Sequence, residues 1–293
     1  MAGRARAFTL IELLVVIAII ALLIGILVPA LGRARDTARA MEAASGARTL
    51  VQSYALYADD HSSFLMPAHL AGSNEIDSDP AFRPTADITD ESGLPLIETY
   101  PGFLGNAAAG RWLYRLRPYF DYTFRGASHV GTRAKTLGEE VDVLFGDAAP
   151  EPYVESQYPS FGVNRFYLGG DYRAPGLRYL NDGQTVTRIQ EPFSPSTLLT
   201  FASARFAQPS YRIDGWHVVE APEFGSEFDE NGTTQSPATA FGHLRPQYLG
   251  RAMTGFLDGH ASGLTAEELM DRRFWADPAA RAGDPEWTPE DDD

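Results

Sequence analysis

Two histidines and an aspartate in the last sixth of the chain are the side chains best suited to chemistry. His243, Asp258 and His260 supply two imidazoles and a carboxylate, which are common metal ligands. Asp258-Gly259 is also a strong signal for a tight hairpin turn, beside which the histidines would only hydrogen-bond the backbone. The pattern allows a metal or ligand site on a hairpin, but the turn alone is a sufficient explanation.

A group of acidic residues between positions 220 and 231 is a candidate calcium loop. Clustered carboxylate and carbonyl oxygens in flexible loops bind hard cations such as Ca²⁺. The spacing does not match an EF-hand, however, and a solvated acidic loop has the same composition. We therefore expect no cofactor, with Ca²⁺ as the one alternative. The group consists of Glu220, Glu223, Glu227, Asp229, Glu230 and Asn231.

The common catalytic motifs are missing from the sequence. Serine, histidine and aspartate occur, but no G-x-S-x-G elbow, no H-E-x-x-H pair and no phosphate-binding glycine loop is found. The chain has no cysteine, which excludes a cysteine nucleophile, thiolate metal sites and disulfides. We therefore expect a protein that is not an enzyme.

Charge is distributed unevenly along the chain. The 293 residues include 24 Lys+Arg and 39 Asp+Glu, for a net charge of −15, which argues against a nucleic-acid partner. Residues 1–58 carry six arginines and only three acids, whereas the remaining residues carry 18 basic and 36 acidic side chains. The first fifth of the chain is thus physically different from the rest.

An apolar segment explains that difference. Leu13 to Leu31 is a run of nineteen residues without a charge, long enough as a helix to cross about 30 Å of bilayer hydrocarbon. Gly25 and Pro29 interrupt the run, but membrane helices tolerate both residues. Glu12 lies at its start, where a carboxylate is costly and therefore usually functional. The segment predicts a membrane helix with one functional acid.

Three interpretations of this N-terminus compete. The first is a secretory signal peptide cleaved near Ala30-Leu31-Gly32, although its apolar run would be unusually long. The second is a plain signal anchor, which would have no use for Glu12. The third is a prepilin leader, for which Glu12 has a purpose. Arg4 and Arg6 favour a cytoplasmic N-terminus, although three arginines also follow the span.

The segment AFTLIEL, from Ala7 to Leu13, resembles the type IV prepilin cleavage and methylation motif. The resemblance implies that prepilin peptidase removes residues 1–7 by cutting between Ala7 and Phe8, and that the new amine of Phe8 is methylated. Glu12 then becomes the fifth mature residue, and Pro29 matches a proline common in the family's helix. The family usually has glycine before the cut, where this chain has alanine.

This resemblance implies a filament subunit, and Glu12 would pair with the amine of a neighbouring Phe8 because a lone buried charge is costly. The expected function is that of a type II secretion pseudopilin in the bacterial inner membrane, with its globular domain in the periplasm. The expected partners are other pilin-like subunits, the inner-membrane secretion platform and membrane lipid. A type IV pilus subunit, or a membrane-anchored enzyme or binding protein, remains an alternative.

We expect the membrane helix of residues 8–31 to continue through residues 32–58 as the spine of a globular domain covering 59–276. Helix formers dominate the second half, and Asp59 to Ser63 followed by Pro67 predict its exit into a loop. Residues 54–67 also resemble the helix exit of secretion pseudopilins. The predicted apolar stripe consists of Ala38, Met41, Ala44, Ala47, Val51, Tyr54 and Ala58.

Strands are expected late in the chain, and residues 241–262 resemble the C-terminal signature of a large pseudopilin-like group. Thr265 and Glu268 form a capping box that predicts a helix to Trp275, followed by an acidic, disordered tail over 277–293. The fold class is α+β, one long helix on a mostly antiparallel sheet. A short helix is expected over 111–119, and strands over 160–168, 197–202, 215–219, 252–257 and 260–264.

Overall fold

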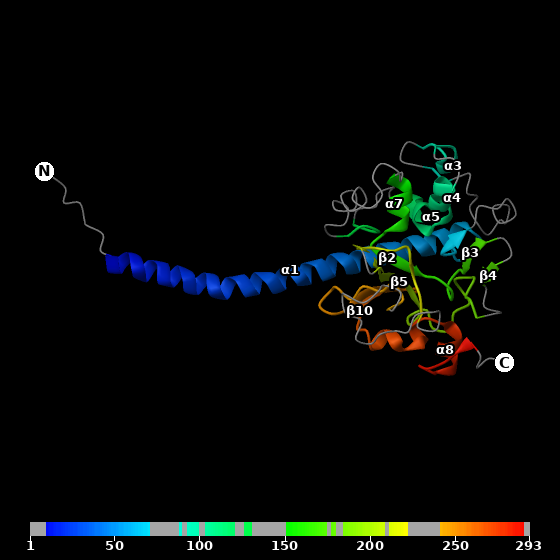
Figure 1. Cartoon of the computed structure of the whole chain (residues 1–293). Helices are drawn as coiled ribbons and strands as arrows, with labels where there is room; N and C mark the ends of the chain where they lie inside the picture. The colour runs from blue at the N-terminus through cyan, green and yellow to red at the C-terminus, as the bar shows by residue number, and fades with distance from the viewer. Residues whose placement is uncertain are drawn as a thin grey trace.

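The computed structural model shows a globular domain from which one long helix projects (Figure 1). The predicted cleavage site, residues 71–87 and most of the acidic loop lie outside the described residues. The residues that the structure describes are 10–70, 88–89, 93–99, 103–120, 126–130, 151–174, 177–179, 184–208, 211–221 and 241–289.

Helix α1 spans Leu10–Asp60 without a break. Its 51 residues correspond to about 76 Å of helix at 1.5 Å per residue. The first fully buried residue of α1 is Ala43, and Ala40 is partly buried against the core, so the domain covers the helix only from about residue 40 onward. This confirms the long helix that was predicted from the apolar run and the helix formers after it.

The second half of α1 runs through the domain between two layers (Figure 1). On one side it contacts the central sheet, and on the other it contacts short helices. Close approach depends on two glycines. A Cβ at Gly46 would lie 2.9 Å from the carbonyl oxygen of Ala127, and a Cβ at Gly255 would lie 2.7 Å from Cγ2 of Val51. The helix can therefore lie almost directly on the backbone of its neighbours.

The predicted stripe on α1 is correct only in its later part. Ala47, Val51, Tyr54 and Ala58 are buried, as expected, whereas Met41 is 68% exposed. Ala38 is exposed as well, because the domain covers the helix only from about Ala40 onward. The buried residues of α1 are Ala43, Gly46, Ala47, Leu50, Val51, Ser53, Tyr54, Tyr57 and Ala58.

The central sheet has five strands in the order β10-β9-β5-β2-β8. All neighbours pair antiparallel except β2 and β8, which run parallel. This confirms the α+β class and each of the five predicted strand regions. The strands are β2 (Phe161–Asn164), β5 (Leu199–Ser203), β8 (Val218–Val219), β9 (Ala252–Phe256) and β10 (Ala261–Leu264).

Short helices cover the face of α1 opposite the sheet (Figure 1). Trp112 ties this layer to β8, because its indole Nε1 donates a 2.6 Å hydrogen bond to the carbonyl of His217. Two smaller sheets, β1-β3-β4 and β6-β7, flank the core. The elements are α3 (Leu96–Thr99), α4 (Phe103–Gly110), α5 (Trp112–Leu116), the 3₁₀ turn η2 (Arg117–Tyr119), α7 (Glu151–Gln157), β1 (His69–Leu70), β3 (Asp171–Ala174), β4 (Leu177–Tyr179), β6 (Phe206–Gln208) and β7 (Tyr211–Ile213).

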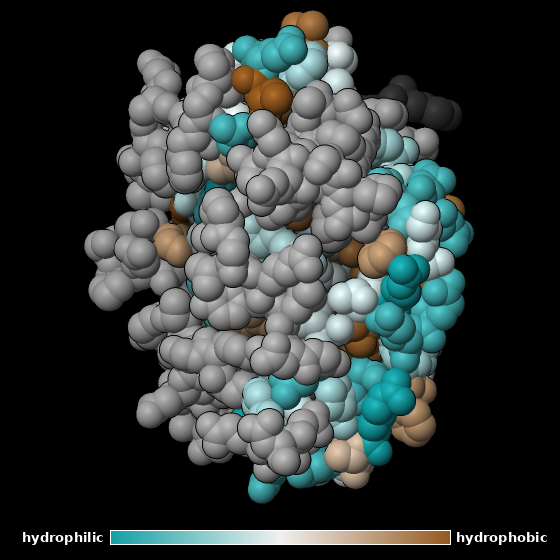
Figure 2. All heavy atoms as spheres, turned by 90° about the vertical axis from the view of Figure 1, so that its right-hand side faces the viewer, coloured by the Kyte–Doolittle hydropathy of each residue, from teal (hydrophilic) through white to brown (hydrophobic). Residues whose placement is uncertain are grey.

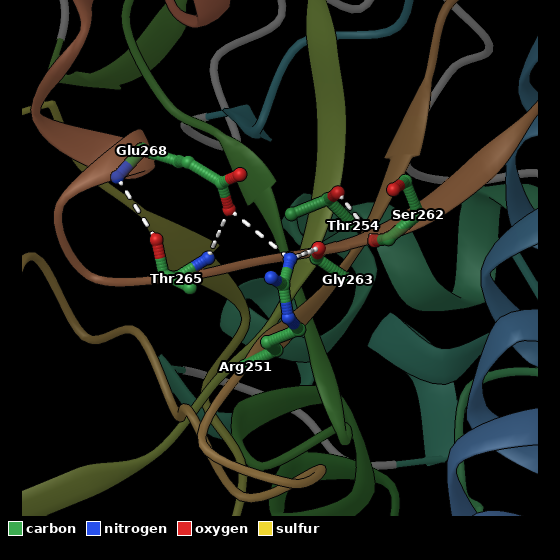
Figure 3. A network of polar contacts seen from close by, with 6 residues as sticks. All are labelled: Arg251, Thr254, Ser262, Gly263, Thr265 and Glu268. Atoms are coloured by element: carbon green, nitrogen blue, oxygen red, sulfur yellow. Dashed lines mark hydrogen bonds and ion pairs between the residues drawn. The ribbon is translucent and has the colours of Figure 1, made fainter.

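The predicted capping box forms after β10, as Figure 3 shows. The backbone N–H of Thr265 donates to the Glu268 carboxylate at 2.7 Å, and the N–H of Glu268 donates to the Thr265 hydroxyl at 3.2 Å. Arg251 joins this box to the hairpin by donating to the carbonyl of Gly263 at 2.7 Å. The expected helix is nevertheless wrong: the chain forms two 3₁₀ turns, η5 (Glu268–Met270) and η6 (Arg272–Phe274).

The prediction of a disordered tail over 277–293 is wrong for the part that the structure describes. Asp277–Ala282 forms helix α8, which ends at Gly283 in the left-handed region. Trp287 is 2% exposed and packs in a second hydrophobic cluster with Tyr167, at 6.1 Å between ring centroids. Burial of Trp287 together with Ala279 holds a segment whose composition is otherwise acidic and proline-rich.

Candidate functional site

The exposed half of α1 is the most unusual surface of the molecule. From Leu10 to Leu31 every large apolar side chain is exposed, between 46% for Val16 and 79% for Leu10. Soluble domains rarely leave such a continuous apolar surface in water. Among the described residues, α1 is long and apolar enough to cross a membrane. By contrast, the end of the domain that faces away from this projecting helix is mainly hydrophilic, with scattered apolar residues, where its surface is described (Figure 2).

Glu12 lies in the first turn of the described helix and is exposed there. It is the single acidic residue between Leu10 and Leu31, so an apolar surface surrounds it. Pro29 lies inside α1, which continues through it. A Cβ placed on Gly25 or Gly32 would meet nothing within 4 Å. The whole segment is thus an uncovered rod with one carboxylate near its end.

A short charged neck connects the apolar rod to the domain. Arg33, Asp36, Arg39 and Glu42 follow one another at three-residue steps, the spacing of neighbours on a helix surface. Arg39 and Asp36 form an ion pair at 3.7 Å, with both side chains more than half exposed. Such surface pairs contribute only about 0–1 kcal/mol, so this pair adds little to the stability of the neck.

The three residues predicted as a metal site do not assemble into one. Within the described part of the chain, no group of three or more His, Asp or Glu residues is placed to hold a metal ion. The ring of His243 is buried against Trp216, with centroids 5.2 Å apart. His260 instead stacks on Phe256 at 4.3 Å, on the β9–β10 hairpin. The two histidines therefore belong to different environments.

The turn interpretation of Asp258 agrees with the geometry. Its Oδ1 accepts a 3.0 Å hydrogen bond from the backbone N–H of His260 and lies 2.6 Å from Nδ1 of the same residue. Gly259 has φ +95°, which is favourable only for glycine. Partial burial raises the pKa of the Asp258 carboxyl, but the bonds from His260 outweigh it and hold that pKa below its usual value. These contacts stabilise the hairpin.

Glu220 does not belong to an open acidic loop. Its carboxylate pairs with Arg165, which also donates a 2.6 Å hydrogen bond to Asp171. Asp171 is 1% exposed, so both acids clamp a largely buried guanidinium. Burial lowers the pKa of Arg165, but the two carboxylates more than offset this and raise it. The other predicted calcium ligands, Glu223 to Asn231, lie outside the described residues.

This ion cluster was not predicted from the sequence. Arg165 and Asp171 are six residues apart on either side of the Gly169-Gly170 turn, and both glycines have positive φ. The sequence alone does not reveal this pairing, because it requires knowing that β8 brings Glu220 alongside. A charged residue on each side of a double-glycine turn was the one available signal.

The comparisons with known proteins concern the N-terminus. The model for the prokaryotic N-terminal methylation motif matches residues 3–28, which include Ala7, Phe8 and Glu12. No curated protein matches the chain, and no solved structure matches it either. The motif implies processing by prepilin peptidase and assembly with other pilin-like subunits, and the exposed apolar helix is consistent with a single-pass inner-membrane anchor. The chain thus carries the N-terminal methylation motif and long apolar helix of a type IV pilin-like protein.

Proposed function

We propose that this protein is a structural subunit of a type II secretion pseudopilus. The observation that carries the proposal is an exposed apolar helix whose first part, including Glu12, lies within the matched methylation motif of residues 3–28. Cleavage between Ala7 and Phe8 and methylation of Phe8 would prepare this helix for assembly. Before assembly the helix rests in the inner membrane with the domain on the periplasmic side, and lipid covers it.

Assembly replaces lipid with neighbouring helices. The apolar side chains from Leu10 to Leu31 make no contact with their own domain, so they are available to pack against other copies. Glu12 and the new amine of Phe8 are opposite charges four residues apart in the sequence. In the dry centre of a filament each would be costly alone, but a pair formed between two subunits compensates both. Glu12 thereby sets the axial register.

A secretion pseudopilus is favoured over a surface pilus by two sequence features. The chain has no cysteine, so it lacks the C-terminal disulfide that many pilins use. Residues 54–67 and 241–262 resemble pseudopilin segments, and the second of these forms the β9–β10 hairpin. The inner-membrane platform of the secretion system is the expected assembly partner.

Replacing Glu12 with leucine tests this function. Leucine keeps the apolar helix intact, so membrane insertion and the melting temperature of the domain should not change. Loss of one partner from a buried pair costs about 3–5 kcal/mol, so we expect filament yield in cells to fall by about 100-fold or more. Glu42→Leu, on the exposed neck of the same helix, is the matched control and should still assemble. Unchanged filament yield for Glu12→Leu would refute the pairing.

A further inference from the structure

Two arginines stand at the point where the neck of α1 meets the apolar rod. Arg33 and Arg35 follow Leu31 almost directly, and both are exposed. Within the part of the chain that the structure describes, neither guanidinium takes part in an ion pair. The two side chains therefore form a local positive site in a chain whose net charge is −15.

The acid closest to this site is paired elsewhere. Asp36 has one arginine three residues before it and another three residues after it, and both are neighbours on the helix surface. Its carboxylate forms the 3.7 Å ion pair with Arg39, on the side of the domain. Arg33, on the side of the apolar rod, has no such pair among the described residues. The positive charge beside the rod is thus left for a partner outside the chain.

The distance of the two arginines from the apolar rod matches a layer of lipid headgroups. At about 1.5 Å per residue, Arg33 and Arg35 lie about 3 and 6 Å beyond Leu31, where the charge-free run ends. The headgroup region of a bilayer is about 5–8 Å thick on each side of the hydrocarbon. Ala40, where cover by the domain begins, lies about 13 Å beyond Leu31. A bilayer around the rod therefore brings headgroups to both arginines and leaves the domain clear of them.

The position of the arginines around the helix distinguishes a lipid surface from a single bound anion. Each residue of an α-helix turns by about 100°, so Arg33 and Arg35 are about 200° apart around the axis of α1. One phosphate ion, or one carboxylate of a neighbouring chain, lies on one side of the helix and reaches only one of them. A headgroup layer surrounds the helix and supplies phosphate on both sides.

We infer that Arg33 and Arg35 bind the phosphate groups of anionic phospholipids in the leaflet on the domain side. The inference rests on the part of the proposed function that places α1 in the membrane before assembly. It gives a role to arginines that follow the span, which the positive-inside rule does not explain for a cytoplasmic N-terminus. It also gives the acidic domain, which an anionic membrane repels, an attractive contact with that membrane.

The lipid next to the neck can be measured with a fluorescent label on Gly32→Cys. The chain has no other cysteine, and a side chain at position 32 has nothing within 4 Å. The labelled full chain is reconstituted at a low protein-to-lipid ratio, and quenching by spin-labelled phosphatidylglycerol is compared with quenching by spin-labelled phosphatidylcholine. We expect phosphatidylglycerol to be preferred. Replacing both Arg33 and Arg35 with glutamine should lower this preference about fivefold or more, because each arginine near an anionic surface attracts it.

Three controls separate this contact from a general effect of charge. Arg48→Gln removes the same charge from an exposed position about 25 Å beyond Leu31, and should leave the preference unchanged. Replacing Arg33 and Arg35 with lysine keeps both charges and should retain it. Sodium chloride at 1 M should weaken it by screening, and inorganic phosphate at equal ionic strength should weaken it no further. A stronger effect of phosphate would indicate a site for the free ion and overturn the lipid assignment.

Extraction with alkaline carbonate, on the same vesicles, separates failure of this inference from failure of the proposed function. A chain that resists extraction but is quenched equally by both lipids would overturn the inference while the membrane helix stands. The same holds if the preference survives the loss of both arginines. A chain that carbonate releases would refute the membrane placement and the inference together.

Discussion

Helix α1 has two halves that differ in what covers them. From Leu10 to Arg39 the helix is exposed, and from about Ala40 to Asp60 the sheet packs against it on one side and the short helices on the other. Both halves contain apolar residues, so hydrophobicity alone does not distinguish them. The second half finds its partners within the chain, whereas the first must find them in lipid or in other subunits. Folding and assembly are therefore assigned to separate parts of one helix.

Replacing Trp112 with alanine should have the largest effect on the packed half. Trp112 is completely buried, and its indole N–H donates a hydrogen bond to the carbonyl of His217. Its ring also packs against Phe201, with ring centroids 5.1 Å apart, and Phe201 in turn contacts Tyr54 of α1. The loss of such a side chain costs about 3–5 kcal/mol. Denaturant unfolding of the detergent-solubilised chain should show this loss. The matched change on the exposed half of α1, Leu22→Ala, should leave the unfolding midpoint of the domain unchanged.

The same glycine-to-alanine substitution should have opposite consequences in the two halves. At Gly46 the new Cβ would lie 2.8 Å from Cγ1 of Val130, so Gly46→Ala should destabilise the domain by about 1–3 kcal/mol. At Gly32 there is nothing within 4 Å, and alanine favours helix by about 1 kcal/mol. Thermal unfolding measures the first effect and helical content the second. Equal melting temperatures for the two variants would contradict the division of the helix.

The smallest predicted effect concerns Tyr54 and alkaline pH. Burial, and secondarily the nearby Tyr57, raise the pKa of Tyr54 well above its usual value of about 10. The unfolded chain loses this proton first, so domain stability is complete below pH 10 and falls as pH rises beyond it. Tyr54→Phe should remove that part of the alkaline loss, and should cost about 1 kcal/mol at pH 7 because the 2.7 Å bond to Met66 is lost. Urea unfolding at pH 7 and above pH 10 compares the two proteins, and an identical alkaline loss in both would exclude Tyr54 as its source.

Much of this architecture is predictable because it depends on local signals. The charge-free run, the capping pair Thr265 and Glu268, and the Asp258-Gly259 turn each act over a few residues, and the structure places helix, cap and turn where these signals lie. Met41 was predicted to be buried and is not, since the stripe continues past the point where the domain ends. That point is set by residues 126–130 and β9, which are distant in sequence.

The C-terminal segment shows the opposite error. Its acidic and proline-rich composition predicts disorder, yet the buried Trp287 ties it to the core. Apolar burial of Trp287 and Ala279 outweighed the composition of their neighbours, and the tryptophan in such a segment was the signal that could have indicated burial. The candidate site divides in the same way: the motif locates Glu12, but the ion cluster of Arg165, Asp171 and Glu220 is visible only in the structure.

The mass of the mature N-terminus tests the central claim most directly. Mass spectrometry of the protein purified from membranes should find a chain that begins with N-methylated Phe8, since only that amine can compensate Glu12 in a neighbouring subunit. A chain that still begins at Met1, or one cut near Gly32, would contradict the account. It would indicate instead a membrane-anchored or secreted enzyme or binding protein, in which the bare helix has no role in assembly.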